Sequence, residues 1–247
     1  MVLSLVYHSN GAGNVRLLGT GNTKTLKGEK YGYQTFIMHL APSTVSGYNV
    51  CPMASLGCAA ACLNTSGRGQ FRKTQEARIT KTRWFFENRT TFMAQLVKDV
   101  EAAIRKAKRE ALIPVFRLNG TSDIRWENIE VAGAQNIMAM FPTVQFYDYT
   151  KLPNRKNIPS NYHLTFSRSE SNQADVEATS LNIAVVFSVL PKTYLGRTVV
   201  NGVDTDLTFT YPDNVVVGLL AKGKAKKDMT GFVVHNPFDY REYTNAA

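Results

Sequence analysis

Three cysteines, Cys51, Cys58 and Cys62, lie within twelve positions of this chain of 247 residues, and the rest of the sequence contains none. Cysteines that serve only as small buried hydrophobic residues would be scattered through the core-forming segments. The segment around them, residues 42–70, is instead rich in glycine, alanine and serine. Thiolates select soft metal centres such as zinc ions and iron–sulfur clusters. The clustering therefore predicts a metal site.

The number of cysteines bears on the kind of metal site. A closed structural zinc site has four nitrogen or sulfur ligands, whereas three protein ligands leave one position open for chemistry. A zinc ion would need a fourth ligand, such as His39 or water, and inert core thiols are the plain alternative. We favour an iron–sulfur cluster over both.

The charge of the chain suggests a second kind of partner. It has 29 lysines and arginines against 19 acidic residues, a formal net charge of +10. Such a charge attracts polyanions, so nucleic acid is a candidate partner. The basic residues form no single dense run, and an ordinary solvated surface explains them equally well. We expect weak, non-specific nucleic-acid binding at most.

The composition is that of an ordinary globular protein, with 44% hydrophobic and 19% charged residues. No apolar run approaches the length of a membrane span, so we expect no membrane partner. The first ten residues lack the basic leader and long apolar core of a signal peptide. The cysteines are too few and too clustered for a disulfide scaffold, so we expect a protein of the reducing cytoplasm.

The secondary structure is predicted from apolar patterns. A long helix with one apolar face is expected over 80–110, a second over 126–140 and a short one near 174–180. A hairpin turn is expected at Asn201 and Gly202. Apolar segments predict six buried strands and a short last one, at residues 35–40, 113–118, 144–150, 162–167, 182–188, 215–220 and 231–235.

Strands that alternate with helices predict an α/β fold with a parallel sheet and right-handed crossovers. No glycine-rich dinucleotide fingerprint follows any strand, which argues against a Rossmann domain. A complete barrel needs eight strand–helix pairs, more than this chain offers. We therefore predict a single-domain, partial (β/α)6 barrel-like parallel sheet over residues 35–247. An irregular N-terminal arm is expected over 1–34, and the metal loop over 42–70.

Polar residues follow the predicted strands at the edge where such folds build their sites. The loops that leave the carboxyl ends of parallel strands form the active face. The cysteine loop leaves the first strand, residues 119–123 leave the second and residues 167–170 leave the fourth. We therefore expect these residues to surround the cysteines. As plain alternatives, Asp123 caps a helix that starts near Arg125, and Arg168 pairs with Glu170 or Asp148.

A strand followed at once by a three-cysteine loop, in a six-stranded partial barrel, resembles the radical S-adenosylmethionine superfamily. That resemblance implies a 4Fe–4S cluster on the three cysteines, with S-adenosylmethionine bound to the fourth iron. It also implies contacts to that cofactor from Asn119, Gly120, Ser122, Asp123, Ser167 and Arg168. The chain departs from the superfamily in two ways. Six and then three residues separate its cysteines, rather than three and two, and Ala61 replaces an aromatic residue before the last cysteine.

The chain also resembles a phage family known as gene product eighty-eight. The resemblance lies in five short sequence motifs: Cys51-Pro-Met-Ala, Cys58-Ala-Ala-Ala-Cys62, Arg117-Leu-Asn-Gly-Thr-Ser-Asp123, Phe166-Ser-Arg-Ser-Glu170 and Val217-Gly-Leu-Leu-Ala-Lys-Gly223. This resemblance implies a viral source and no particular activity. We therefore expect a phage iron–sulfur protein of the host cytoplasm, radical S-adenosylmethionine-like, with a small molecule at the open iron. The alternative is a non-catalytic iron–sulfur or zinc protein that binds a small ligand or nucleic acid.

Overall fold

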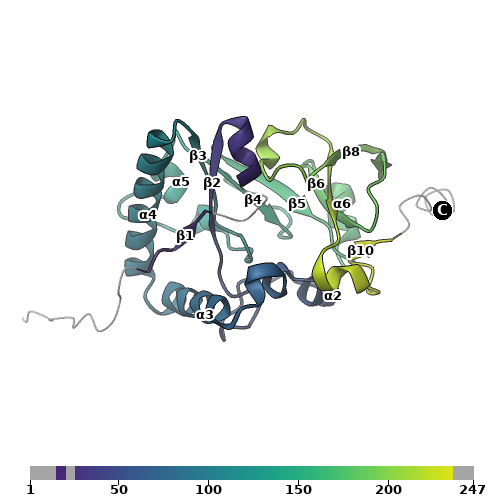
Figure 1. Cartoon of the computed structure of the whole chain (residues 1–247), viewed down its shortest axis with the longest axis horizontal. Coiled ribbons are helices and arrows are strands. Elements are labelled where there is room, and N and C mark those ends of the chain that lie inside the picture. The colour runs from purple at the N-terminus through teal and green to yellow at the C-terminus, as the bar shows by residue number, and fades with distance from the viewer. Residues whose placement is uncertain (1–14, 21–25, 236–247) are drawn as a thin grey trace, which may run out of the picture.

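All six predicted buried strands are present in the computed structural model, which describes residues 15–20 and 26–235 (Figure 1). They lie side by side in chain order, and each is parallel to the next. This sequential order is the order of strands in α/β barrels, whereas doubly wound sheets reverse direction at a switch point. The strands are β2 (Tyr33–Met38), β3 (Ile113–Arg117), β4 (Gln145–Thr150), β5 (Tyr162–Ser167), β6 (Ile183–Phe187) and β9 (Val216–Leu220).

Four short strands extend this parallel core to a sheet of ten. β1 (Leu18–Gly19) is antiparallel to β2, and β8 (Arg197–Asn201) is parallel to β9. β7 (Thr193–Tyr194) is antiparallel to β8, and β10 (Val233–Val234) pairs with the end of β6. The mixed α/β class and the mostly parallel sheet are confirmed. The path ends at β1 and β7, and no pairing joins these ends among the described residues, so the barrel-like curvature stays a prediction.

The predicted N-terminal arm lies partly outside the described residues, which omit 1–14 and 21–25. Its described part contributes β1 and the short 3-10 helix η1 (Lys27–Tyr31). Within the described residues, no helix has both the length and the apolar character needed to cross a membrane.

The predicted long helix over 80–110 is wrong as a single helix. Two helices stand there, α3 (Arg72–Glu87) and α4 (Arg89–Arg109), and Asn88 separates them. Asn88 leaves the helical conformation, with φ −145° and ψ 68°, and its side chain accepts a hydrogen bond from the amide of Thr91. This is the N-cap role that asparagine favours. The predicted apolar face is present on α4, where Phe92, Leu96, Val100 and Ala107 are buried.

Two other local predictions are wrong. Residues 126–140 form only the 3-10 helix η4 (Trp126–Asn128) and the short α5 (Ile137–Met140), with a tight turn at Ala132 and Gly133 between them. The hairpin turn lies at Leu195 and Gly196, which both have positive φ, and not at residues 201 and 202. The predicted helix near 174–180 is present as α6 (Gln173–Ala178).

The two faces of the sheet are covered differently. One face, with Phe36, Phe116 and Phe146, packs in a core shared with Leu96 of α4 and Trp126. On the other face, Val115 and Tyr147 pack against Leu207 and Phe209, which belong to the irregular segment between β8 and β9. That segment contains the 3-10 helix η5 (Thr208–Thr210).

Candidate metal centre

The cysteine loop runs from the end of β2 to α3. It contains α2 (Leu56–Ala60) and two 3-10 helices, η2 (Leu63–Thr65) and η3 (Gly67–Gln70). Figure 1 shows α2, α3 and the yellow segment after β9, which contains η6 (Gly223–Lys227), together along the lower edge of the molecule. Cys51, Cys58 and Cys62 form no disulfide, and all three residues are partly exposed.

Cys51 is held against the turn that follows β3. Its Sγ donates to the carbonyl oxygen of Thr121 at 3.7 Å, and the neighbouring carbonyl of Val50 accepts from the amide of Asp123 at 2.7 Å. Gly120 lets the same turn lie close against the end of β2, because a Cβ there would lie 2.6 Å from the carbonyl oxygen of Met38. The turn at 120–123 therefore positions the first cysteine.

Cys58 lies in α2, whose start is held by Glu170 from the loop after β5. One carboxylate oxygen of Glu170 accepts from the amide of Gly57 at 2.7 Å, and the other accepts from the hydroxyl of Ser55 at 2.8 Å. The Ser55 hydroxyl caps the helix by accepting from the amide of Cys58. A Cβ on Gly57 would lie 2.1 Å from the hydroxyl oxygen of Thr230, so α2 packs tightly against the chain before β10.

Cys62 lies beside a buried cation. Its Sγ accepts from the amide of Asn64 at 3.5 Å, and the side-chain oxygen of Asn64 accepts from Nη1 of Arg78 in α3. Arg78 is only 9% exposed, and its Nε has no hydrogen-bond partner. Burial raises the pKa of Cys62, whereas the positive charges of Arg78 and Lys151 oppose that rise.

The three thiols influence one another electrostatically. Burial raises the pKa of Cys51 to about 11, and negative charge on Cys62 or Cys58 would raise it further. Negative charge on Cys58 likewise raises the pKa of Cys62. Across residues 15–20 and 26–235, no three His, Cys, Asp or Glu side chains are grouped as ligands of one ion.

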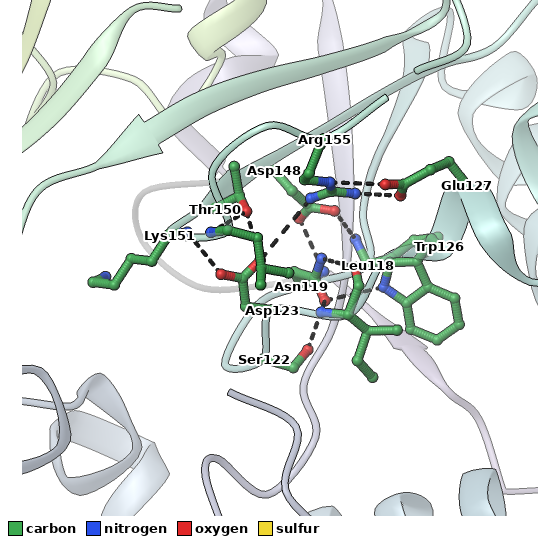
Figure 2. Close-up of polar contacts among 12 residues, drawn as sticks. Leu118, Asn119, Ser122, Asp123, Trp126, Glu127, Asp148, Thr150, Lys151 and Arg155 are labelled. Carbon is green, nitrogen blue, oxygen red and sulfur yellow. Dashed lines mark hydrogen bonds and ion pairs between the residues drawn. The ribbon is translucent and has the colours of Figure 1, made fainter. Parts of the chain in front are cut away.

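Three of the residues predicted to bind a cofactor, Asn119, Ser122 and Asp123, belong to a buried hydrogen-bond network, shown in Figure 2. The side-chain oxygen of Asn119 accepts from Ser122 Oγ at 2.8 Å, from the amide of Ile124 at 3.0 Å and from Trp126 Nε1 at 3.0 Å. The side-chain NH2 of Asn119 donates to the carbonyl oxygen of Ile124. Asn119 and Ser122 therefore fix the shape of the turn after β3.

Asp123 also has protein partners on both carboxylate oxygens (Figure 2). One oxygen accepts from Thr150 Oγ1 at 2.8 Å and lies 3.9 Å from Nη1 of Arg155, and the other accepts from the amide of Lys151 at 2.7 Å. Asp123 thus joins the turn after β3 to the end of β4. The alternative role as a helix cap is wrong, because only η4 follows and its N-cap, Arg125, makes no side-chain cap bond.

Arg168 and Ser167 follow β5 and have different surroundings. Nη1 of Arg168 donates to the carbonyl oxygens of Gly231 and Phe232, and this holds the chain that leads into β10. In the described part of the chain, Arg168 forms no ion pair with Glu170 or Asp148. The hydroxyl of Ser167 accepts from Nζ of Lys151 at 2.9 Å. Of these two residues, Ser167 is the one bonded to a cation beside the cysteines.

A sequence model of the family described as Gene product 88 matches residues 16–236 of the chain. The chain belongs to the Gene product 88 family, a family of phage proteins. The match includes the cysteine loop and the turns after β3 and β5. No curated protein and no solved structure matches the chain.

Two residues beside the cysteines of this Gene product 88 chain are missing from the sequence-based site, Arg78 and Lys151. Lys151 directly follows the predicted strand 144–150, so its position at a carboxyl strand end was a usable signal. Arg78 lies before the predicted start of the helix at residue 80, and nothing in its neighbours marks it as buried. Only the packing of α3 places it behind Cys62.

His39, at the carboxyl end of β2, is expected to stay neutral at pH 5. Burial, together with the positive charges of Arg78, Arg117 and Lys81, lowers its pKa to about 3. The unfolded chain takes up this proton near pH 6.5, so acid favours unfolding. Between about pH 6.5 and 3, the free energy of unfolding should fall by up to about 1.4 kcal/mol per pH unit through this group.

Proton NMR of the His39 ring and urea unfolding at pH 7 and pH 5 measure these two effects. The His39→Gln variant is the control, and its unfolding free energy should change less between the two pH values. A His39 ring that titrates near pH 6.5 in the folded protein would contradict the expectation.

Proposed function

We propose that this Gene product 88 protein is an iron–sulfur protein whose Cys51, Cys58 and Cys62 hold a 4Fe–4S cluster. One observation carries the proposal: the three thiols lie on one loop at the carboxyl edge of a parallel sheet, and that loop is hydrogen-bonded to the turns after β3 and β5. A 4Fe–4S cluster takes thiolate ligands, each on a separate iron, so the three sulfurs need not share one ion. Three cysteines would leave one iron open.

The charges around the loop support the same proposal. Arg78 is buried next to Cys62, and in the described residues it forms no ion pair with a carboxylate. Buried charges are normally paired, because an isolated one loses its hydration. Protonated thiols leave this guanidinium uncompensated, whereas metal-bound thiolates supply negative charge beside it. Metal binding would therefore release the thiol protons and compensate Arg78 together.

The chain's own residues would orient the cluster ligands. The turn after β3 holds the backbone next to Cys51, because the amide of Asp123 donates to the carbonyl oxygen of Val50, and Glu170 with Ser55 fixes the start of the helix that carries Cys58. A bound cluster of this kind supplies one-electron transfer and a Lewis-acidic iron at its open position. The partial exposure of the thiols would give a small molecule access to that iron.

S-adenosylmethionine is the ligand that the radical enzyme hypothesis assigns to the open iron. Its amino group would share Asp123 with Thr150 and the Lys151 amide, which already occupy that carboxylate. The non-catalytic alternative is an iron–sulfur protein that only binds a small ligand. We place either form in the cytoplasm of the host, where thiols stay reduced.

Anaerobic purification and reconstitution with iron and sulfide test the proposal. We expect a brown protein with about four irons and four sulfides per chain. A colourless protein that takes up one zinc and no iron would replace the proposal with the zinc alternative. Adding S-adenosylmethionine to the reduced, reconstituted protein tests the radical branch, because chelation changes the electron paramagnetic resonance signal of the cluster.

A further inference from the structure

Lys151 reaches toward the cysteine loop from the end of β4. Figure 2 shows its backbone beside Asp123 and its side chain pointing away from the buried network. Its Nζ donates to Ser167 Oγ at 2.9 Å and lies 5.8 Å from the ring centroid of Phe232. An ammonium group has three donors, so two remain for a ligand. The Ser167 hydroxyl accepts from Lys151 and can donate its own proton outward.

Arg78 offers further donors from α3. One of its five N–H donors goes to Asn64, and its Nε is buried without a partner. A buried donor without an acceptor is energetically costly, so such groups commonly mark the position of a ligand or a water molecule.

Both cations approach Cys62. Arg78 is bonded to Asn64, whose amide donates to Cys62 Sγ. Lys151 lies near Phe232, which packs in one hydrophobic cluster with Ala61 and Cys58. The donors of Lys151, Ser167 and Arg78 therefore converge on one region beside the last cysteine.

No carboxylate in the described residues forms an ion pair with Lys151 or Arg78. Asp123 interacts with the Lys151 ammonium only at longer range, and its oxygens already accept from Thr150 and the Lys151 amide. Glu170 is engaged by the start of α2. The region thus holds two cations and several unused donors, without an anion to match them.

We propose that Lys151, Ser167 and Arg78 bind a small oxyanion, the carboxylate or phosphate group of a ligand that lies beside the cysteine loop. Lysine and arginine are the usual partners of such groups, since charge-assisted hydrogen bonds are the strong ones. A nucleic-acid backbone does not fit, because Arg78 is buried. The oxyanion site consists of residues other than the thiols and does not require the cluster.

Calorimetric titration of the full-length, metal-free, reduced chain tests this inference, with malonate and inorganic phosphate as probes in a chloride buffer of low ionic strength. The variant is Lys151→Met. Its control is Lys226→Met, which removes the same charge from an exposed position of η6. Lys151→Met should weaken binding about tenfold or more, as loss of a charge-assisted hydrogen bond does, and Lys226→Met should not. Ser167→Ala should weaken it less than Lys151→Met.

Binding of either probe with this pattern supports the site, and the preferred probe distinguishes carboxylate from phosphate ligands. Equal affinity in wild type and Lys151→Met overturns the inference, provided that circular dichroism shows both folded. Equal weakening by Lys226→Met also overturns it, since attraction would then come from net charge. Binding only after iron reconstitution overturns it too, because the iron would hold the anion. If the chain binds malonate but takes up no iron, the oxyanion site is supported and the iron–sulfur proposal is rejected.

Discussion

Replacing any one of the three cysteines by serine should remove the iron from the reconstituted chain, from about four atoms to none. A serine hydroxyl is a hard, protonated group and a poor ligand for a soft iron–sulfur centre. Each variant should still fold, because Cys51, Cys58 and Cys62 are partly exposed and serine is close to cysteine in size. Iron and sulfide analysis measures the effect, and far-ultraviolet circular dichroism checks the fold.

Ala59→Ser is the matched control for Cys58→Ser. It introduces the same hydroxyl at the next position of α2, where the side chain is exposed. The control should keep its full iron content. If Cys58→Ser also keeps its iron, the three thiols do not share a cluster, and the proposed iron–sulfur function fails.

Replacing Glu127 by alanine should destabilise the protein by about 3–5 kcal/mol, the usual cost of removing one partner of a buried ion pair. Glu127 and Arg155 form a two-pronged pair whose side chains are 1% and 3% exposed, with Arg155 Nε 2.9 Å from Glu127 Oε1 (Figure 2). Without Glu127, the remaining acidic neighbours of the guanidinium among the described residues are Asp123, 3.9 Å away, and Asp148 at longer range. Urea unfolding measures the loss.

Glu76→Ala is the control for this measurement. Glu76 pairs with Arg72 on the exposed surface of α3, and both side chains are more than half exposed. Exposed pairs of this spacing contribute at most about 0.5 kcal/mol. If Glu127→Ala also lowers the free energy of unfolding by only about 0.5 kcal/mol, water must reach Arg155, and the network around Asp123 is then hydrated.

The sequence by itself determined the strands and the location of the cysteines. Each strand is a short apolar run bounded by turn-forming residues, and such a run needs only burial on both faces to become a strand in a parallel sheet. The clustering of three cysteines is likewise visible without a structure. Because strands that alternate with helices are parallel, the strand-end turns could be assigned to one edge before any coordinates were known.

The helix boundaries were harder to predict because local signals compete. Asn88 lies within an otherwise continuous apolar stripe. Its backbone leaves the helical conformation and its side chain caps the start of α4, so α3 ends there. Residues 126–140 contain the apolar residues of a helix, yet the tight turn at Ala132 and Gly133 divides them. In both places a few residues outweigh the average helical preference of the segment.

Only the tertiary structure decided which side chains lie beside the cysteines and which are occupied. Asp123 was a plausible cap or cofactor contact, but Lys151 and Thr150, more than 25 positions away in the chain, take up its oxygens. Glu170 reaches the start of α2 across 113 positions. Arg78 has no local feature that predicts its burial behind Cys62. The physical reason is that burial, desolvation and hydrogen-bond pairing depend on contacts between distant segments, whereas sequence patterns report mainly on neighbours.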